Sequence, residues 1–164
     1  MRLRPVTQED SERLLKWRNL PEVRRYMYTD HIITQEEHDR WFGGMLNDTK
    51  GRCYLIFEYD EKPVGMVGFT GLNNPHGTAD FAYYLGEPVP KGTGQEMEKL
   101  SIKYAFEELK IRKLSCEVLD FNERVIHIHK KYGFEEEGIF KRHIVKNGKE
   151  YDVHRFGMVA PNKY

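Results

Sequence analysis

Val89-Pro90-Lys91-Gly92-Thr93-Gly94 separates a run of strand-forming residues, 79–86, from a run with helical spacing, 95–109. Two glycines between a strand and a helix let backbone N–H groups point toward one centre, and the first turn of the helix adds its positive end. This arrangement is typical of a phosphate-binding loop. The third glycine of a dinucleotide fingerprint would fall on Met97, and no Gly-Lys-Ser/Thr of a Walker loop follows. A plain turn that needs glycine for positive φ is the alternative interpretation.

Strand and helix signals alternate on both sides of this loop. Strands are expected at residues 2–6, 53–59, 63–70, 79–86, 113–119, 139–146 and 150–159. Helices are expected after the capping residues Thr7 and Thr34, in a short stretch at 23–28, and at 95–109 and 122–132. Asn147-Gly148 favours a type I′ turn between the last two strands. The order predicts one α/β domain over residues 1–164 with a mixed sheet.

Composition excludes several classes of protein. Lys plus Arg and Asp plus Glu both number 26 among the 164 residues, so no net charge attracts the chain to nucleic acid or anionic lipid. The two cysteines, Cys53 and Cys116, are expected to be core residues or free thiols. No apolar run approaches the ~18 residues of a membrane span, and residues 1–5 lack the apolar stretch of a signal peptide. A cytoplasmic location is therefore expected, with no nucleic-acid or membrane partner.

A second motif follows the strand at 113–119. Asn122, Val125, Lys131 and Gly133-Phe134, together with the glycine loop, resemble the acetyl-CoA-binding half of the GNAT superfamily of N-acetyltransferases. In that family Q/R-x-x-G-x-G/A opens the phosphate-binding helix, and N-x-x-A-x-x-x-Y-x-K-x-G-F follows on the next strand and helix. The resemblance implies a largely antiparallel central sheet flanked by helices, with a C-terminal β-hairpin.

The resemblance also implies acetyl-CoA as cosubstrate and no metal. The residues it implies for acetyl-CoA binding are Leu85, Lys91, Gly92, Thr93, Gly94, Asn122 and Lys131. Two positions depart from the family pattern. Val89 replaces the usual Gln or Arg, so this side chain donates no hydrogen bond to the pyrophosphate. His129 stands where the family has tyrosine, and Tyr132 lies about 300° further round the helix, so His129 is the candidate proton donor to the departing sulfur.

The N-terminal half resembles one branch more closely, the acetyltransferases of pseudaminic-acid biosynthesis, which act on a UDP-linked 4-amino sugar. Trp17-Arg18-Asn19 and Tyr26-Met27-Tyr28 carry much of this likeness. The implied substrate-binding residues are Arg18, Met27, Tyr28, His38, Trp41, Thr70 and Phe81. Five of these have a simpler interpretation: the residues at 38 and 41 as a core stripe, the arginine as a partner of the helix dipole, and those at 27 and 28 as packing residues.

Glu117 is the candidate general base. A carboxylate in the middle of a strand is costly to bury unpaired, so it lies either on an exposed face or beside the acceptor amine. We expect direct acetyl transfer from acetyl-CoA to the 4-amino group of a UDP-linked amino-dideoxy sugar, UDP-4-amino-4,6-dideoxy-N-acetyl-β-L-altrosamine. The alternatives are an N-terminal acetyltransferase of ribosomal proteins and a non-catalytic acyl-CoA-binding module. An exposed edge of the C-terminal hairpin would permit a homodimer.

Overall fold

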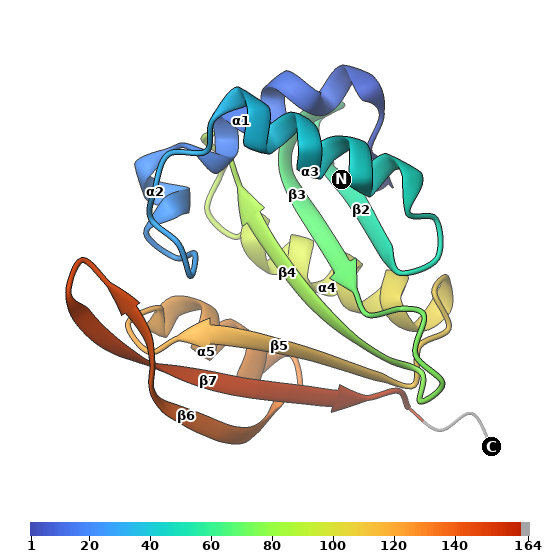
Figure 1. Cartoon of the computed structure of the whole chain (residues 1–164). Helices are drawn as coiled ribbons and strands as arrows, with labels where there is room; N and C mark the ends of the chain where they lie inside the picture. Colours follow the sequence, from blue (N-terminus) through green and yellow to red (C-terminus); the bar gives the residue numbers. More distant parts are fainter. Residues whose placement is uncertain (162–164) are drawn as a thin grey trace.

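The computed structural model describes residues 1–161 as helices on both sides of a seven-stranded sheet (Figure 1). The strands are β1 (Arg2–Pro5), β2 (Arg52–Tyr59), β3 (Lys62–Thr70), β4 (Thr78–Leu85), β5 (Lys113–Leu119), β6 (Glu135–Lys146) and β7 (Lys149–Val159). The helices are the 3₁₀ turn η1 (Gln8–Asp10), α1 (Ser11–Arg18), α2 (Pro21–Arg24), α3 (Gln35–Asn47), α4 (Thr93–Glu107) and α5 (Glu123–Lys131).

The strand order is β1-β2-β3-β4-β5-β7-β6, in which β4 and β5 run parallel and the other neighbours run antiparallel. This confirms the predicted mixed, largely antiparallel sheet and its C-terminal hairpin. Helices α1 to α3 cover one face, and α4 and α5 cover the other (Figure 1). One core cluster therefore lies on each face, around Trp17 and Phe42 on the first and around Phe69 and Phe156 on the second.

The parallel pair β4 and β5 diverges along its length. Its ladder joins Thr78 to Asp80 with Lys113 to Ser115, and beyond these residues the two strands separate (Figure 1). From Phe81 to Leu85, β4 pairs with β3 on one side. The backbone groups on its other side therefore remain available to a ligand between the strands.

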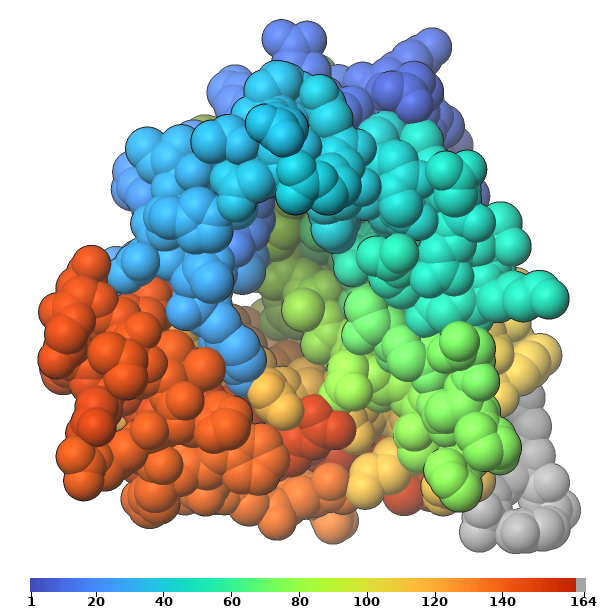
Figure 2. All heavy atoms as spheres, viewed as in Figure 1, coloured from blue at the N-terminus to red at the C-terminus, as the bar shows by residue number. Residues whose placement is uncertain are grey.

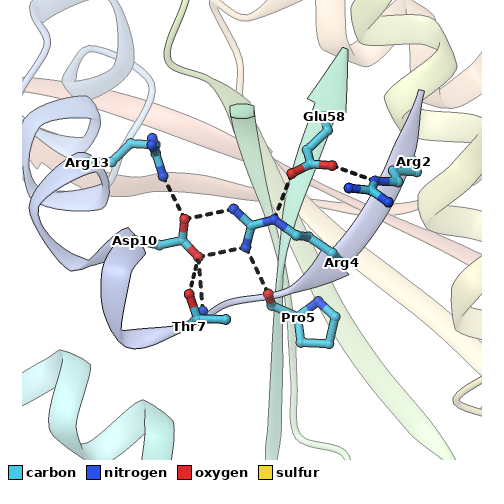
Figure 3. Close-up of polar contacts among 7 residues, drawn as sticks. All are labelled: Arg2, Arg4, Pro5, Thr7, Asp10, Arg13 and Glu58. Atoms are coloured by element: carbon cyan, nitrogen blue, oxygen red, sulfur yellow. Dashed lines mark hydrogen bonds and ion pairs between the residues drawn. The ribbon is translucent and has the colours of Figure 1, made fainter. Parts of the chain in front are cut away.

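A polar network attaches the N-terminal strand to the rest of the fold (Figure 3). Arg4 donates to Asp10 Oδ2 and Oδ1 at 2.7 and 2.9 Å, and to Glu58 Oε1 at 2.7 Å. Arg13 and Arg2 complete the pairing of these two buried carboxylates. The Thr7 backbone N–H donates to Asp10 at 2.9 Å, as expected of the predicted capping pair.

Two predicted element boundaries were wrong. The short helix occupies Pro21–Arg24 instead of residues 23–28, because proline suits the first helical position and the following carbonyls bind a lysine described below. Strand β6 begins at Glu135, four residues before the expected start. Its acidic run pairs with β7 because Glu136 and Glu137 form ion pairs with His154 and Lys113.

Candidate active site

A cavity of about 1080 Å³ lies where β4 and β5 separate, beneath helices α1 to α3. Its mouth is the hollow between the N-terminal helices and the C-terminal strands in Figure 2. The walls come from α1, α2, α3 and the loop after α2, from the strands of the sheet centre, and from α5. A volume of this size is at the upper end of small-molecule sites and has room for two substrates.

The structure brings most of the predicted site residues to this cavity. All seven predicted substrate residues line it: Arg18, Met27, Tyr28, His38, Trp41, Thr70 and Phe81. The predicted catalytic residues Glu117 and His129 line it as well, as do Leu85, Gly94 and Asn122. Lys91, Gly92, Thr93 and Lys131 are outside the lining and belong to the loop and helix ends next to it. Whether each residue contacts substrate stays a prediction.

The glycine loop has the geometry of an anion site. Gly92 is the N-cap of α4 with φ of +96°, a conformation that favours glycine, and a Cβ there would meet no atom within 4 Å. The Thr93 hydroxyl donates to the Pro90 carbonyl at 2.8 Å and closes the turn. Lys131 lies beside this helix start, because its Nζ donates to Gln95 Oε1 at 3.0 Å. The positive N-terminal end of α4 with an ammonium beside it suits the phosphates of CoA.

Glu117 is held by two neighbours. Its Oε2 accepts a hydrogen bond from the Tyr28 hydroxyl, and its Oε1 lies 3.0 Å from Arg155 Nη1. The same guanidinium atom lies 2.6 Å from Asp80 Oδ1, so Arg155 joins β4 to β5 where the strands part. Burial and the contact with Glu117 raise the pKa of Tyr28, which keeps the phenol protonated as a donor. The predicted carboxylate is thus paired and stands at an exposed position of β5 that borders the cavity.

His129 is buried under the cavity and paired with a carboxylate. Its Nδ1 lies 2.7 Å from Glu98 Oε1, and the two side chains are 3% and 0% exposed. The rings of Phe81, Phe134 and Phe156 surround the imidazole, with centroids 5.2 to 5.8 Å away. With Nδ1 engaged by Glu98, Nε2 is the ring nitrogen left for a ligand.

A buried phenol lies next to this pair. Burial and the charge of Glu98 raise the pKa of Tyr83 well above its ordinary value. Burial likewise raises the pKa of the Cys116 thiol, which also lines the cavity. A protonated buried thiol is a poor nucleophile, which agrees with direct transfer rather than an acyl-enzyme route.

His38 and Trp41 belong to both the core and the cavity wall. His38 is 3% exposed, its Nε2 lies 3.0 Å from the Ser11 hydroxyl, and its ring packs between Trp41 and Phe42. Burial lowers the pKa of His38, so the ring is neutral near pH 7. The two interpretations offered by the sequence are therefore compatible, since this stripe packs on the sheet and also borders the hollow.

Arg18 presents an unmatched positive charge to the cavity. Its Nη2 reaches Thr29 Oγ1 at 3.3 Å, while Nη1 is buried with no hydrogen-bond partner in residues 1–161. Burial lowers the pKa of this guanidinium, as expected of a cation without a carboxylate in contact. An anionic or carbonyl group of a ligand would satisfy Nη1.

Sequence reasoning missed Glu98, Tyr83, Asp80 and Arg155. For Glu98 the sequence does contain a signal, a stripe along one helix face. Its members, which recur at helical spacing and are all buried, are Gly94, Glu98, Ser101 and Ala105. A glutamate within such a stripe predicts a buried partner. Nothing comparable identifies Arg155, because its contacts depend on how three strands are placed.

Over residues 1–161, no group of three or more His, Cys, Asp or Glu side chains is arranged to hold a metal ion. None of the helices described is both long and apolar enough to cross a membrane.

Comparisons with known proteins agree with this geometry. Residues 1–135 match the family model of the acetyltransferase (GNAT) domain. The acetyltransferase PseH of Campylobacter jejuni subsp. jejuni is 30% identical over 129 residues, 79% of each chain. The spermidine N(1)-acetyltransferase of Escherichia coli K12 is 29% identical over 149 residues, covering 90% of this chain and 80% of the relative.

Solved structures show the same fold. The spermidine N-acetyltransferase of Vibrio cholerae, in complex with CoA and spermine, superposes with a TM-score of 0.87 at 21% identity over 96% of this chain and 94% of its own. The glycine loop at the start of α4, the diverging strands and the family model together account for one enzyme class, the acetyl-CoA-dependent N-acetyltransferases. This chain belongs to the GNAT acetyltransferase family.

Proposed function

We propose that the acceptor is an amino sugar carried on a uridine diphosphate, acetylated at its 4-amino group. The donor acetyl-CoA supplies a thioester, and the acceptor must bring a neutral amine. UDP-4-amino-4,6-dideoxy-N-acetyl-β-L-altrosamine is the specific acceptor that we favour, since the relative in Campylobacter is PseH and the match covers 79% of this chain. The expected cytoplasmic setting is consistent with a nucleotide-linked substrate.

The observation that carries this proposal is the charge arrangement of the cavity. Arg18 offers a buried guanidinium nitrogen without a hydrogen-bond partner in the described chain, and three of the cavity carboxylates lie against other groups. Asp80 and Glu117 contact Arg155, and Glu37 accepts from the Thr34 N–H and His31. Arg18 is therefore a cavity cation with no carboxylate in contact, and it favours an acceptor with an anionic group.

The walls of the cavity suit the rest of such an acceptor. Trp41, Tyr54 and Tyr84 form an aromatic wall on the face covered by α1 and α3. Trp41 and Tyr54 meet edge to face with ring centroids 5.4 Å apart. In such a pair, one ring keeps a face on which a base or a sugar ring can stack. Met27 and Val118 give apolar contacts suited to a deoxy methyl group.

Two residues handle the two proton transfers of the reaction, one from the acceptor amine and one to the departing sulfur. Glu117 takes the amine proton through a water, because both its oxygens are already within hydrogen-bond distance of protein groups. The backbone N–H groups of β4 near Leu85 face the gap between the strands and stabilise charge on the acetyl oxygen. His129, oriented by Glu98, donates a proton to the departing sulfur.

A polyamine is the second candidate acceptor. Two observations favour it: Glu22, Glu37, Asp80 and Glu117 all border the cavity, and spermidine acetyltransferases are among the relatives. For a polyamine, Asp80 and Glu117 would exchange Arg155, and Glu37 would exchange the helix cap, for substrate ammonium groups. Glu22 has no polar partner within residues 1–161 and would need no exchange. The exchange at the other three carboxylates leaves two arginines opposed to a cationic ligand, so we place this candidate second.

Thiol release from acetyl-CoA tests the proposal. The purified protein is given the UDP-linked 4-amino sugar, spermidine or a ribosomal N-terminal peptide, and each product is checked by mass for one added acetyl group. We expect turnover on the nucleotide sugar. Turnover on the peptide alone or on spermidine alone would overturn the proposed acceptor. Binding of acetyl-CoA without thiol release for any amine would instead support a non-catalytic module.

A further inference from the structure

A lysine of the C-terminal hairpin reaches across the molecule to the N-terminal half. Lys146 is the last residue of β6, beside the hairpin turn, and it is only 7% exposed. Its Nζ donates to three backbone carbonyls, those of Arg24 at 3.2 Å, Arg25 at 2.9 Å and Met27 at 2.6 Å. The hairpin end and the α2 segment lie side by side in Figures 1 and 2.

This contact uses the whole bonding capacity of an ammonium group. A charged lysine has three N–H donors and no acceptor, and each donor here has one carbonyl. Burial lowers the pKa of Lys146, while the nearby charge of Asp30 opposes that change. The carbonyls at the end of α2 point toward the ammonium, in the way that cations commonly complete helix C-termini. Methionine could fill the space but could not donate.

Two of the three carbonyls, those of Arg25 and Met27, belong to the loop of residues 25–28 that forms one wall of the cavity, and the third ends α2. Met27 and Tyr28 both line the cavity, and the Tyr28 hydroxyl donates to Glu117. A second contact supports the loop from the same side: Tyr26 stacks on Phe121 at 5.7 Å, and Phe121 meets Tyr151 of β7 at 5.1 Å. The C-terminal hairpin therefore determines where Tyr28 lies.

We propose that Lys146 is a positioning residue for the acceptor, acting through the loop of residues 25–28 rather than by touching substrate. This inference rests on the proposed function only in the identity of the acceptor. The acetyl-CoA side of the site, at the start of α4 and at α5, makes no contact with Lys146 in the described chain. Loss of the ammonium should therefore weaken one substrate and leave the other unaffected.

The test compares Lys146→Met with Lys141→Met, a change on the same strand at an exposed lysine that pairs with Asp152. For Lys146→Met we expect KM for the acceptor to rise about tenfold or more, since charge-assisted hydrogen bonds to the loop are lost. KM for acetyl-CoA should stay within about twofold in both variants. Lys141→Met should match the wild type in both constants.

Hydrogen exchange gives a readout that needs no acceptor. Amides of residues 25–28 should exchange faster in Lys146→Met than in the wild type or Lys141→Met, while those of α4 should be unchanged. Unchanged exchange at 25–28 would overturn the inference, and so would equal rises of both KM values with faster exchange throughout the chain, the result of general destabilisation. If the wild type fails to acetylate the nucleotide sugar, the proposed acceptor is wrong, and hydrogen exchange still decides the role of Lys146.

Discussion

At the scale of single residues, the replacement of the family's tyrosine by His129 has a structural explanation. The histidine comes with Glu98, which holds Nδ1 in a site closed to solvent, so the ring has one orientation and one remaining nitrogen. In our proposal, His129 oriented by Glu98 therefore takes the proton-donor role of the family's tyrosine.

His129→Phe should reduce kcat about 10²-fold, because the aromatic packing is kept while the proton donor is lost. His129→Tyr should retain most of the activity. Steady-state thiol release with saturating acetyl-CoA measures both. Unchanged kcat in His129→Phe would remove this residue from the chemistry.

Glu98→Gln tests the pairing itself. The amide keeps the size of the side chain and a hydrogen-bonding atom near Nδ1 but removes the charge, so kcat should fall about tenfold in the wild-type background. In the His129→Phe background the same change should have no further effect on kcat, because the two residues act as a unit. Additive losses in the double variant would show that Glu98 acts without His129.

Arg18→Met tests the recognition of an anionic acceptor. Removing the guanidinium should raise KM for the nucleotide sugar about tenfold or more and leave KM for acetyl-CoA unchanged. Arg18→Lys, which keeps the charge without the planar fork, should recover part of the loss. If Arg18→Met instead improves turnover of spermidine and has no effect on the sugar, the positive charge serves no acceptor anion.

At the scale of elements, local signals predicted best. The Thr34 capping box begins α3 as expected, with the Thr34 hydroxyl accepting from Glu37 and the Glu37 side chain accepting in return. The boundaries that failed depend on distant partners, such as the acidic start of β6, which forms ion pairs with β5 and β7. Local sequence contains no information about those partners.

The N-terminal network makes acid stability an element-level prediction. Burial acts to raise the pKa of Asp10 and of Glu58, but the bonds from Arg4 and its neighbours outweigh it and lower both pKa values. Carboxyls with lowered pKa stabilise the fold above their unfolded pKa values, near pH 4, and lose that contribution as the pH falls through the folded values. The free energy of unfolding should therefore decrease below about pH 5.

Asp10→Asn provides the matched variant. At pH 7 it should lower the free energy of unfolding by about 2 kcal/mol, since Arg4 and Arg13 lose a charged partner. Its stability should also depend less on pH between about 5 and 3 than that of the wild type. Urea unfolding at several pH values measures both, and parallel pH curves for the two proteins would contradict this explanation.

At the scale of the whole molecule, the cavity results from the divergence of β4 and β5 under a cover of N-terminal helices. The family resemblance predicted many of the residues that line the cavity, although Lys91, Gly92, Thr93 and Lys131 lie outside its lining. The arrangement of charged groups around the cavity could not be predicted from the sequence. It depends on Arg155 and Lys146, which come from the last two strands. The open edge of β6 keeps homodimer formation as a prediction, which sedimentation can test.

A competition assay tests the central claim, an anionic acceptor, most directly. The UDP-linked 4-amino sugar and spermidine are supplied together at equal concentration with limiting acetyl-CoA, and the acetylated products are counted by mass spectrometry. The product ratio equals the ratio of kcat/KM values, and we predict at least about 100 to 1 in favour of the nucleotide sugar. An excess of acetylated spermidine would contradict the claim and make the cavity carboxylates, rather than Arg18, the determinants of acceptor choice.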